Sequence, residues 1–159
     1  MKYTGRRRLI VLLLFALSIM ACSAFSQRGR YQVVGESNAP TYSDGDWLTT
    51  EKVDLINIKR GDFVVLDNPV ESIIQVKRII ALPGKKVEIV DGKVSIDGKE
   101  LAEAYLAPAP GTKSHGGQAS WTIGANELFV MGDNRAGSQD SRFWGPIDYK
   151  LVRGRVIKD

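Results

Sequence analysis

The chain has 159 residues, of which 43% are hydrophobic, enough for one domain with a buried core. Its net charge of +4 lies in the N-terminal tail, because Lys2, Arg6, Arg7 and Arg8 are four of the 22 basic residues and the other 18 balance the 18 acidic ones. A nucleic-acid-binding domain carries its basic residues on the folded surface, so this distribution excludes nucleic acid as a partner. A single cysteine also excludes an internal disulfide.

Residues 9–25 form an uncharged, apolar segment directly after the basic tail. As a helix it would be about 25 Å long, close to the hydrocarbon thickness of a bilayer. The positive-inside rule predicts a cytoplasmic tail (1–8), a transmembrane anchor (9–25), a linker (26–32) and an extracytoplasmic domain (33–159) at the cell membrane. Two alternatives stay open: a signal cleaved near Ala21-Cys22-Ser23, and a lipoprotein signal that ends at Cys22.

Short β-prone runs separated by turns make up the rest of the chain. Asp91-Gly92 and Asp97-Gly98 are typical of two-residue hairpin turns, and residues 107–117 are expected to be a flexible connection. No long segment after the anchor has helical periodicity, so we expect a mainly β domain with an antiparallel sheet. The expected strands are 31–34, 47–53, 62–66, 72–80, 86–90, 93–96, 127–131 and 151–157.

A first candidate site is the turn at residues 35–46, GESNAPTYSDGD. Its glycines and proline can present Ser37 with an exposed backbone N–H, which suits both a nucleophile and an oxyanion donor. Read alone, the segment is equally typical of an ordinary serine-rich loop. The chain has one histidine and one cysteine, so a serine activated by a neutral lysine is the leading arrangement for hydrolysis.

A second candidate is Lys77, in the apolar run 72–84, SIIQVKRIIALPG. Alternation places Lys77 on a face with Ile73 and Ile79, while Ile74 and Ile80 make the opposite face apolar too. This pattern is typical of an interior strand, where burial favours the neutral amine. A surface lysine whose stem packs on the sheet is the alternative.

A third candidate is the polar segment 132–145, GDNRAGSQDSRFWG. Asp133, Asn134 and Asp140 could be calcium ligands, but two arginines argue against a divalent cation and the EF-hand spacing is absent. We therefore predict no metal and a network of Asp–Arg pairs that holds this loop against the lysine strand.

Taken in order, these segments resemble the type I signal peptidases, serine peptidases with a Ser/Lys dyad, and especially the short members with one anchor. The similarity is collinear from the tail to the C-terminus: G-x-S-x-x-P-T at 35–41, G-D at 45–46, K-R-I-I-x-L-P-G at 77–84 and G-D-N-R-x-x-S-x-D-S-R-x-x-G at 132–145. Four ordered blocks are far more specific than a serine motif alone. The resemblance implies a membrane-bound endopeptidase that removes signal peptides from exported preproteins after small residues (A-x-A), without a cofactor.

The resemblance also implies roles for individual residues. Ser37 attacks the scissile carbonyl and its backbone N–H forms half of the oxyanion hole, while neutral Lys77 takes the hydroxyl proton. Ser138 orients the lysine amine. The remaining supporting residues are two pairs, Asp140 with Arg142 and Asp133 with Arg78. The residues expected to bind an extended substrate are Val33, Val34, Gly35, Ile74 and Val76.

The chain departs from the family directly after the nucleophile, where most members carry methionine and this sequence has Asn38. That difference keeps a catalytically weakened homologue, which binds exported chains without cutting them, as an alternative. A peptidase dedicated to conjugative pilin is another alternative. Self-cleaving repressors share the dyad, but they need a DNA-binding domain where this chain has the apolar segment.

Overall fold

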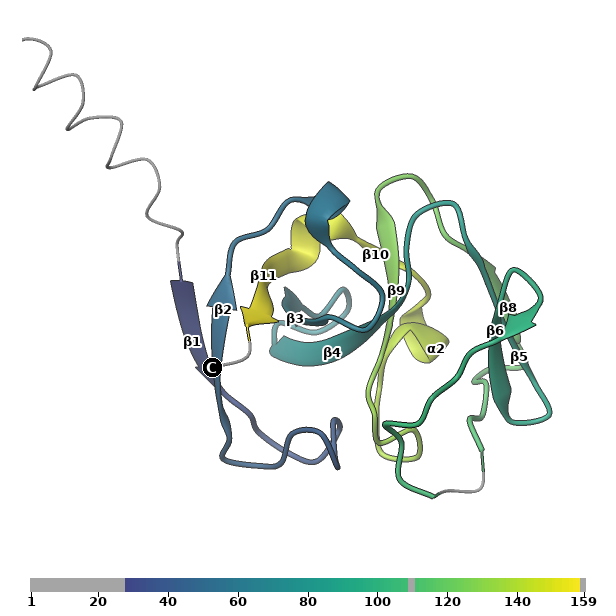
Figure 1. Ribbon diagram of the computed structural model, residues 1–159, viewed down its shortest axis with the longest axis horizontal. Coiled ribbons are helices and arrows are strands. Elements are labelled where there is room, and N and C mark those ends of the chain that lie inside the picture. Colours follow the sequence, from purple (N-terminus) through teal and green to yellow (C-terminus); the bar gives the residue numbers. More distant parts are fainter. Residues whose placement is uncertain (1–27, 109–110, 158–159) are drawn as a thin grey trace, which may run out of the picture.

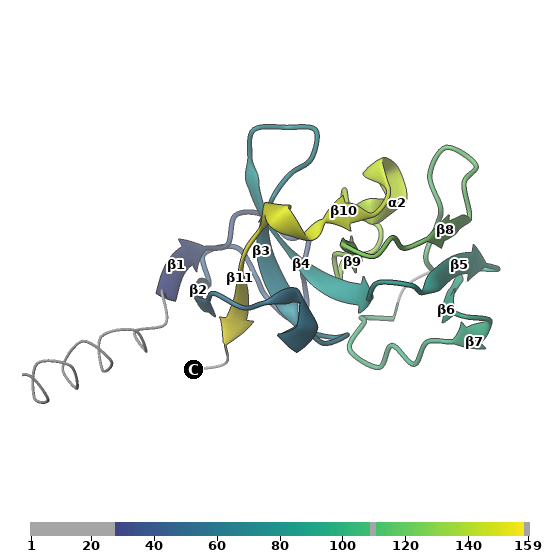
Figure 2. The ribbon, with the colours of Figure 1, turned by 90° about the horizontal axis from the view of Figure 1, so that it is seen from above.

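The computed structural model describes residues 28–108 and 111–157, which fold into two antiparallel sheets (Figures 1 and 2). The larger sheet has the strand order β1-β2-β11-β3-β4-β9-β10, and the smaller has the order β7-β6-β5-β8. The prediction of a mainly β, antiparallel domain is confirmed. The strands are β1 (Arg28–Gln32), β2 (Trp47–Glu51), β3 (Phe63–Asp67), β4 (Ile74–Ala81), β5 (Lys86–Val90), β6 (Lys93–Ile96), β7 (Lys99–Glu100), β8 (Ser120–Thr122), β9 (Glu127–Met131), β10 (Ile147–Asp148) and β11 (Val152–Ile157).

Within residues 28–108 and 111–157, helical structure is confined to single turns. They are α2 (Ser141–Trp144) and two 3₁₀ turns, η1 (Leu55–Asn57) and η2 (Tyr149–Leu151). Over the ranges that the structure describes, no helix has the length and apolar character needed to cross a membrane. The predicted tail (1–8) and anchor (9–25) lie outside those ranges, so they stay predictions.

The hairpins of the smaller sheet form where the sequence predicts them. Asp91 and Gly92 both have positive φ (49° and 79°), as do Asp97 and Gly98 (51° and 77°), which is the conformation of a two-residue type I′ turn. Cross-strand pairing continues on either side of each turn, from Val90 to Lys93 and from Ile96 to Lys99. Strands β7, β8 and β10 were not predicted, because two or three residues cannot display an alternating pattern.

The first strand begins earlier than predicted. We expected a linker over 26–32 and a strand over 31–34, but β1 covers Arg28–Gln32 and pairs with β2 along its whole length. The pairing ends at Gln32 opposite Trp47, because the chain then turns away into the loop that carries Ser37. Val33 and Val34 therefore belong to the base of that loop and not to a strand.

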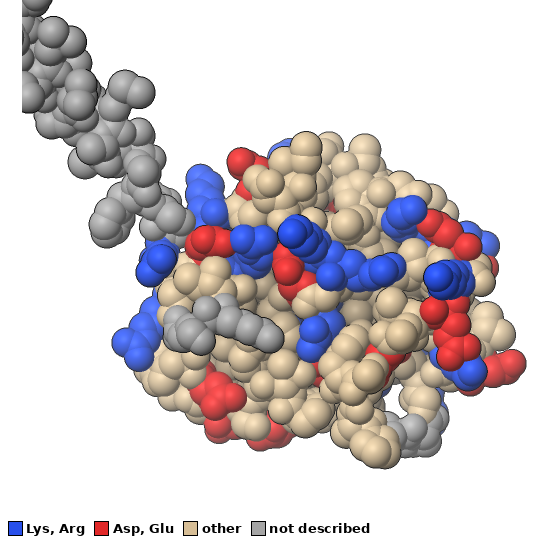
Figure 3. Space-filling view, viewed as in Figure 1, with Lys and Arg blue, Asp and Glu red and all other residues tan. Residues whose placement is uncertain are grey.

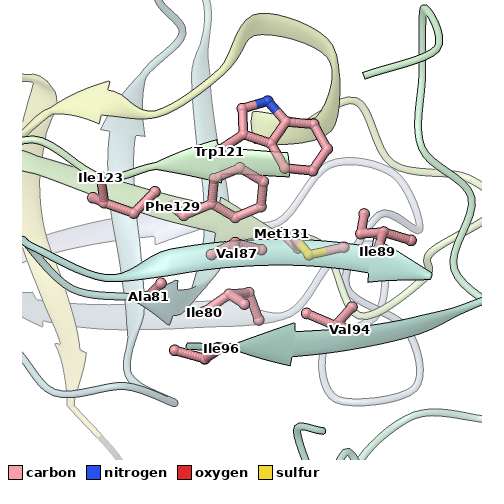
Figure 4. Packing of buried hydrophobic residues seen from close by; sticks show 10 residues of the cluster. All are labelled: Ile80, Ala81, Val87, Ile89, Val94, Ile96, Trp121, Ile123, Phe129 and Met131. Carbon is pink, nitrogen blue, oxygen red and sulfur yellow. The ribbon is translucent and has the colours of Figure 1, made fainter. Parts of the chain in front are cut away.

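Strands β4 and β9 lie between two hydrophobic cores. On one side, Ile79 packs with residues of β3 and with Leu128 and Val130 of β9. On the other, Ile80 and Ala81 pack with Phe129 and Met131 and with the inner face of the smaller sheet (Figure 4). Both faces of β4 are thus buried over its second half, as the sequence predicts for an interior strand. This strand carries Lys77.

Charged side chains of both signs lie beside one another on the face seen in Figure 3. Exposed ion pairs join Lys85 with Asp97 and Arg153 with Asp67. Such pairs contribute little to stability because both partners stay hydrated. The charge of this surface is therefore mixed, and the ion pairs with structural importance are buried elsewhere.

Candidate active site

Ser37 and Lys77, forty residues apart in the sequence, line one groove of about 630 Å³. Four of the five residues expected to bind substrate also line this groove: Val33, Val34, Ile74 and Val76. Val34 is 87% exposed and Ile74 is 47% exposed, so an apolar rim faces solvent on both sides of the groove. Gly35, the fifth, is not among its lining residues and instead shapes the Ser37 turn.

The Ser37 loop spans residues 33–46, between β1 and β2. Two hydrogen bonds close its base, from Val33 N to Asp46 O (2.8 Å) and from Gly45 N to Val33 O (2.9 Å). Gly35 has a φ of 81°, and its N–H donates to Asp44 Oδ1 at 2.7 Å, so the chain reverses just before Ser37. The loop thereby presents a half-buried Ser37 at the groove.

The segment 132–138 packs directly against the Ser37 turn. Asn134 donates twice to it, from its backbone N to Ser37 O (3.1 Å) and from Nδ2 to Glu36 O (3.1 Å). A Cβ placed on Gly132 would overlap both Ser37 O and Ser138 Oγ. The close approach of the two loops therefore requires glycine at position 132.

Lys77 is 2% exposed and lies opposite Val64 of β3. Burial lowers the pKa of its amine from 10.5 to about 8, Asp140 acts in the opposite direction, and Arg142 lowers the pKa further. The dominant cause is desolvation, because a charged ammonium loses its hydration in this environment. A neutral amine at the groove is a competent proton acceptor.

Asp140 and Arg142 form a fully buried ion pair, with both side chains 0% exposed. Asp140 also accepts a hydrogen bond from Gly132 N (3.0 Å), and Arg142 donates to the carbonyls of Arg135 (2.8 Å) and Ser138 (3.1 Å). The pair therefore closes the loop upon itself and satisfies its buried backbone groups.

Asp133 and Arg78 form the other pair that the resemblance implies. Arg78 donates to Asp133 through Nε (2.7 Å) and Nη2 (2.6 Å), a bidentate contact that joins the loop to β4. The guanidinium lies between the rings of Phe63 and Tyr105, 4.3 and 4.0 Å from their centroids. Because Asp133 and Asp140 each face an arginine, the loop does not offer the oxygen cage of a calcium site.

Ser138 is buried, and its Oγ has no hydrogen-bond partner among the described residues. The contact of Ser138 with Lys77 that the resemblance implies stays a prediction.

A third buried ion pair, between Arg135 and Glu103, was not predicted from the sequence. Arg135 also donates hydrogen bonds to Thr112 Oγ1 and to the Tyr105 hydroxyl. Arg135 lies inside the recognised motif, but Glu103 is in a segment without a distinguishing pattern.

Asn38 is the other residue whose position the sequence does not reveal. It is 1% exposed, lines the groove, and donates from Nδ2 to Val76 O (2.9 Å) and to Ser37 Oγ (3.3 Å). A polar residue next to Ser37 thus joins the Ser37 loop to the strand that carries Lys77.

Comparison with known proteins finds one family over almost the whole chain. Residues 6–158 match the family model of signal peptidase, peptidase S26. The signal peptidase I of Bacillus licheniformis is 40% identical over 133 residues, covering 78% of this chain and 72% of that protein. That of Leptolyngbya laminosa is 33% identical over 147 residues, covering 84% and 68% respectively. The crystal structure of a signal peptidase I from Enterococcus faecalis aligns with a TM-score of 0.56 and 31% identity, over 64% of this chain and 97% of that one.

Proposed function

Given that this chain belongs to the signal peptidase family, peptidase S26, we propose that it removes signal peptides from exported preproteins with Ser37 as nucleophile and Lys77 as general base. The observation that carries this proposal is the groove that both residues line. One of them is half-buried on a turn, and the other is buried on an interior strand where its amine loses a proton readily.

The chemistry proceeds through an acyl-enzyme. Ser37 Oγ attacks the scissile carbonyl while neutral Lys77 takes the hydroxyl proton, and the resulting ammonium then protonates the leaving amine. A water molecule attacks the ester in the second half, again with Lys77 as base, and frees Ser37. With a pKa of about 8, roughly one tenth of the Lys77 amines are neutral at pH 7, which is enough for a working base.

The substrate binds as an added strand beside β4. Strand β3 pairs with β4 from Ile74 onward, but β9 pairs with it only from Arg78 onward. Residues 74–77 therefore have no strand neighbour on their second side within the described part of the chain. This edge borders the groove that Val33 and Val34 also line, and an extended peptide can hydrogen-bond to its backbone, where Asn38 Nδ2 already donates to Val76 O. Shallow apolar walls suit the small side chains of an A-x-A signal.

The supporting residues hold the dyad in place. Asp140 with Arg142 and Asp133 with Arg78 fix the 132–138 segment between the Ser37 turn and β4. Ser138, buried in the same segment, is the hydroxyl that orients the Lys77 amine. We assign all five to positioning and not to the chemical step.

We also propose that residues 9–25 anchor the enzyme in the cell membrane with residues 1–8 in the cytoplasm. The catalytic domain would then lie on the side where preproteins emerge, with the lipid bilayer beside it.

Cleavage of a preprotein tests the proposal. The purified full-length chain in detergent or lipid vesicles is incubated with a preprotein that ends its signal in Ala-x-Ala, and the products are identified by mass spectrometry. We expect one cut directly after the second alanine, and no product with Ser37→Ala. An intact preprotein after prolonged incubation with the wild-type chain would overturn the proposal in favour of a binding protein.

A further inference from the structure

The ring of Tyr105 covers a cation that joins three parts of the site. Its centroid lies 4.0 Å from the guanidinium carbon of Arg78, a cation–π contact. Arg78 belongs to β4, forms the bidentate pair with Asp133, and donates from Nη2 to Thr41 Oγ1 (3.3 Å). Thr41 in turn is part of the Ser37 loop. Tyr105 therefore packs on the guanidinium at which β4, the Ser37 loop and the segment 132–138 meet.

The hydroxyl of Tyr105 contacts the other arginine of this region. It donates to Glu103 Oε1 (2.8 Å) and accepts from Arg135 Nη2 (3.4 Å). Burial, with the Glu103 carboxylate beside it, raises the pKa of Tyr105, so the hydroxyl keeps its proton and stays a donor. Glu103 also accepts from Arg135 through both carboxylate oxygens, one of these bonds being 2.9 Å from Nη1 to Oε2. Tyr105 thus contacts one arginine with its ring and the other with its hydroxyl.

Arg135 transmits the position of Glu103 to the Ser37 turn. Its Nε donates to Gly132 O (3.1 Å), and Gly132 is the residue whose added Cβ would overlap Ser37 O. The Arg135 side chain is only 3% exposed. Without the Glu103 charge this guanidinium would be buried unpaired, which is costly, so the side chain would turn towards water and release Gly132 O.

This network lies outside the substrate groove. The side chains of Tyr105, Glu103, Arg78 and Arg135 are not among those that line it. They therefore do not touch an extended peptide bound there, and their effect on the reaction passes through the residues that they hold. Such an effect lowers kcat and leaves KM nearly unchanged, because the walls that bind the substrate stay intact.

We propose that Tyr105 and Glu103 are positioning residues of this active site, acting through Arg78 and Arg135 to hold the Lys77 strand and the Ser37 loop in their relative places. The inference rests on the proposed function and adds residues from a separate part of the chain to the same site. Both residues lie in the connection between β7 and β8, so the arm that links the larger sheet to the smaller one becomes part of the catalytic apparatus.

A series at position 105 tests the role of the ring. Tyr105→Phe keeps the ring over Arg78 and loses only the hydroxyl, so we expect kcat for a preprotein to fall about threefold. Tyr105→Leu loses the ring as well, and kcat should fall about 30-fold. KM should stay within about twofold of the wild-type value in both variants. Tyr149→Leu is the control, because Tyr149 packs in the other core and donates to Val53 O, so its loss should lower the melting temperature without changing kcat.

A double-mutant cycle tests whether Glu103 acts through Arg135. Glu103→Gln keeps the shape of the side chain and removes its charge, and kcat should fall about tenfold. Once Arg135→Met has removed the partner, adding Glu103→Gln should lower kcat no further. Two losses that multiply in the double variant would contradict a common route.

The outcomes separate this inference from the proposed function. If the wild-type chain cleaves the preprotein and Tyr105→Leu loses stability but keeps its kcat, as Tyr149→Leu should, the residues are structural and the positioning role is overturned while the peptidase stands. A higher KM at unchanged kcat overturns it too. A wild-type chain that cleaves nothing overturns the proposed function and this inference together. If Tyr105→Leu does not fold, wild-type kcat in both Tyr105→Phe and Glu103→Gln overturns the inference.

Discussion

The two proposed catalytic residues occupy opposite kinds of environment. Ser37 is half-buried on a loop closed by a few hydrogen bonds, whereas Lys77 is 2% exposed within the interior strand β4. A nucleophile must meet its substrate, so it needs an open position, but a lysine base needs burial to lose its proton near neutral pH. The site combines one residue that the fold exposes with one that the fold desolvates.

The segment 132–142 connects these two environments. Asn134 and Gly132 contact the Ser37 turn, and Asp140 and Arg142 act on the pKa of Lys77. The position of Ser37 and the proton affinity of Lys77 therefore both depend on one loop. Changes to the serine, the lysine, the loop and its surroundings should therefore have effects that differ in kind and in size.

The largest expected effect comes from removing either proposed catalytic residue. Ser37→Ala and Lys77→Met should each lower kcat/KM for a preprotein by about 10⁴-fold or more. Their stabilities should differ, however. Burial lowers the pKa of Lys77 from 10.5 to about 8, which corresponds to a destabilisation of the charged lysine in the folded state by about 3 kcal/mol. Lys77→Met removes this destabilisation, so it should raise the melting temperature at pH 7, whereas Ser37→Ala should not.

Thermal denaturation followed by circular dichroism measures this difference. Lys93→Met is the matched control, because the Lys93 side chain is 65% exposed and its removal should change neither activity nor melting temperature. A Lys77→Met variant less stable than the wild-type chain would contradict the account of Lys77 as a desolvated amine.

The next effect tests the contact between the two loops. Gly132→Ala forces a Cβ against Ser37 O and Ser138 Oγ, so the nucleophile must move. A displacement of about 1 Å at a reacting atom lowers the rate by about 100-fold. Gly124→Ala is the control, since its Cβ would meet only the flexible end of the Glu127 side chain. Equal rates in the two variants, measured at saturating preprotein, would show that Gly132 does not position Ser37.

A third change compares buried with exposed ion pairs. Asp140→Asn leaves the buried Arg142 guanidinium without its counter-charge and should lower the free energy of unfolding by about 3–5 kcal/mol. Asp97→Asn removes an exposed pair with Lys85 and should leave the urea midpoint unchanged. Similar midpoints for the two variants would contradict the structural role assigned to Asp140.

The sequence predicts the parts of this site that depend on local pattern. Alternation identified β4 as an interior strand, and the density of polar residues marked 132–145 as a network; both features are present in the fold. The Asp-Gly pairs identified both hairpins because only a few residue types accept positive φ.

Features that depend on contacts between distant segments could not be predicted in the same way. Glu103 has no local pattern that links it to Arg135, and nothing around Asn38 indicates that its amide reaches Val76, 38 residues away. The start of β1 was missed because its polar residues, RGRYQ, pair through their backbone and show no apolar alternation. The Arg135–Glu103 pair, the Asn38–Val76 hydrogen bond and the start of β1 all depend on contacts between segments that are distant in the sequence.

The smallest expected effect concerns the only histidine of the chain. His115 stacks on Phe143, with ring centroids 3.5 Å apart, and it is not among the residues that line the groove. His115→Ala should therefore leave kcat and KM for a preprotein unchanged and lower the melting temperature slightly. A large loss of kcat in this variant would revive a histidine-based mechanism.

The dependence of kcat/KM on pH tests the Ser37–Lys77 mechanism most directly. Lys77 accepts a proton only when neutral, so the rate should fall tenfold per pH unit below the pKa of the amine and level off above it, with a midpoint near pH 8. His115→Ala should give the same profile, which assigns the midpoint to the lysine. A rate that stays constant from pH 8 down to about pH 5 would contradict a lysine base and with it the central claim.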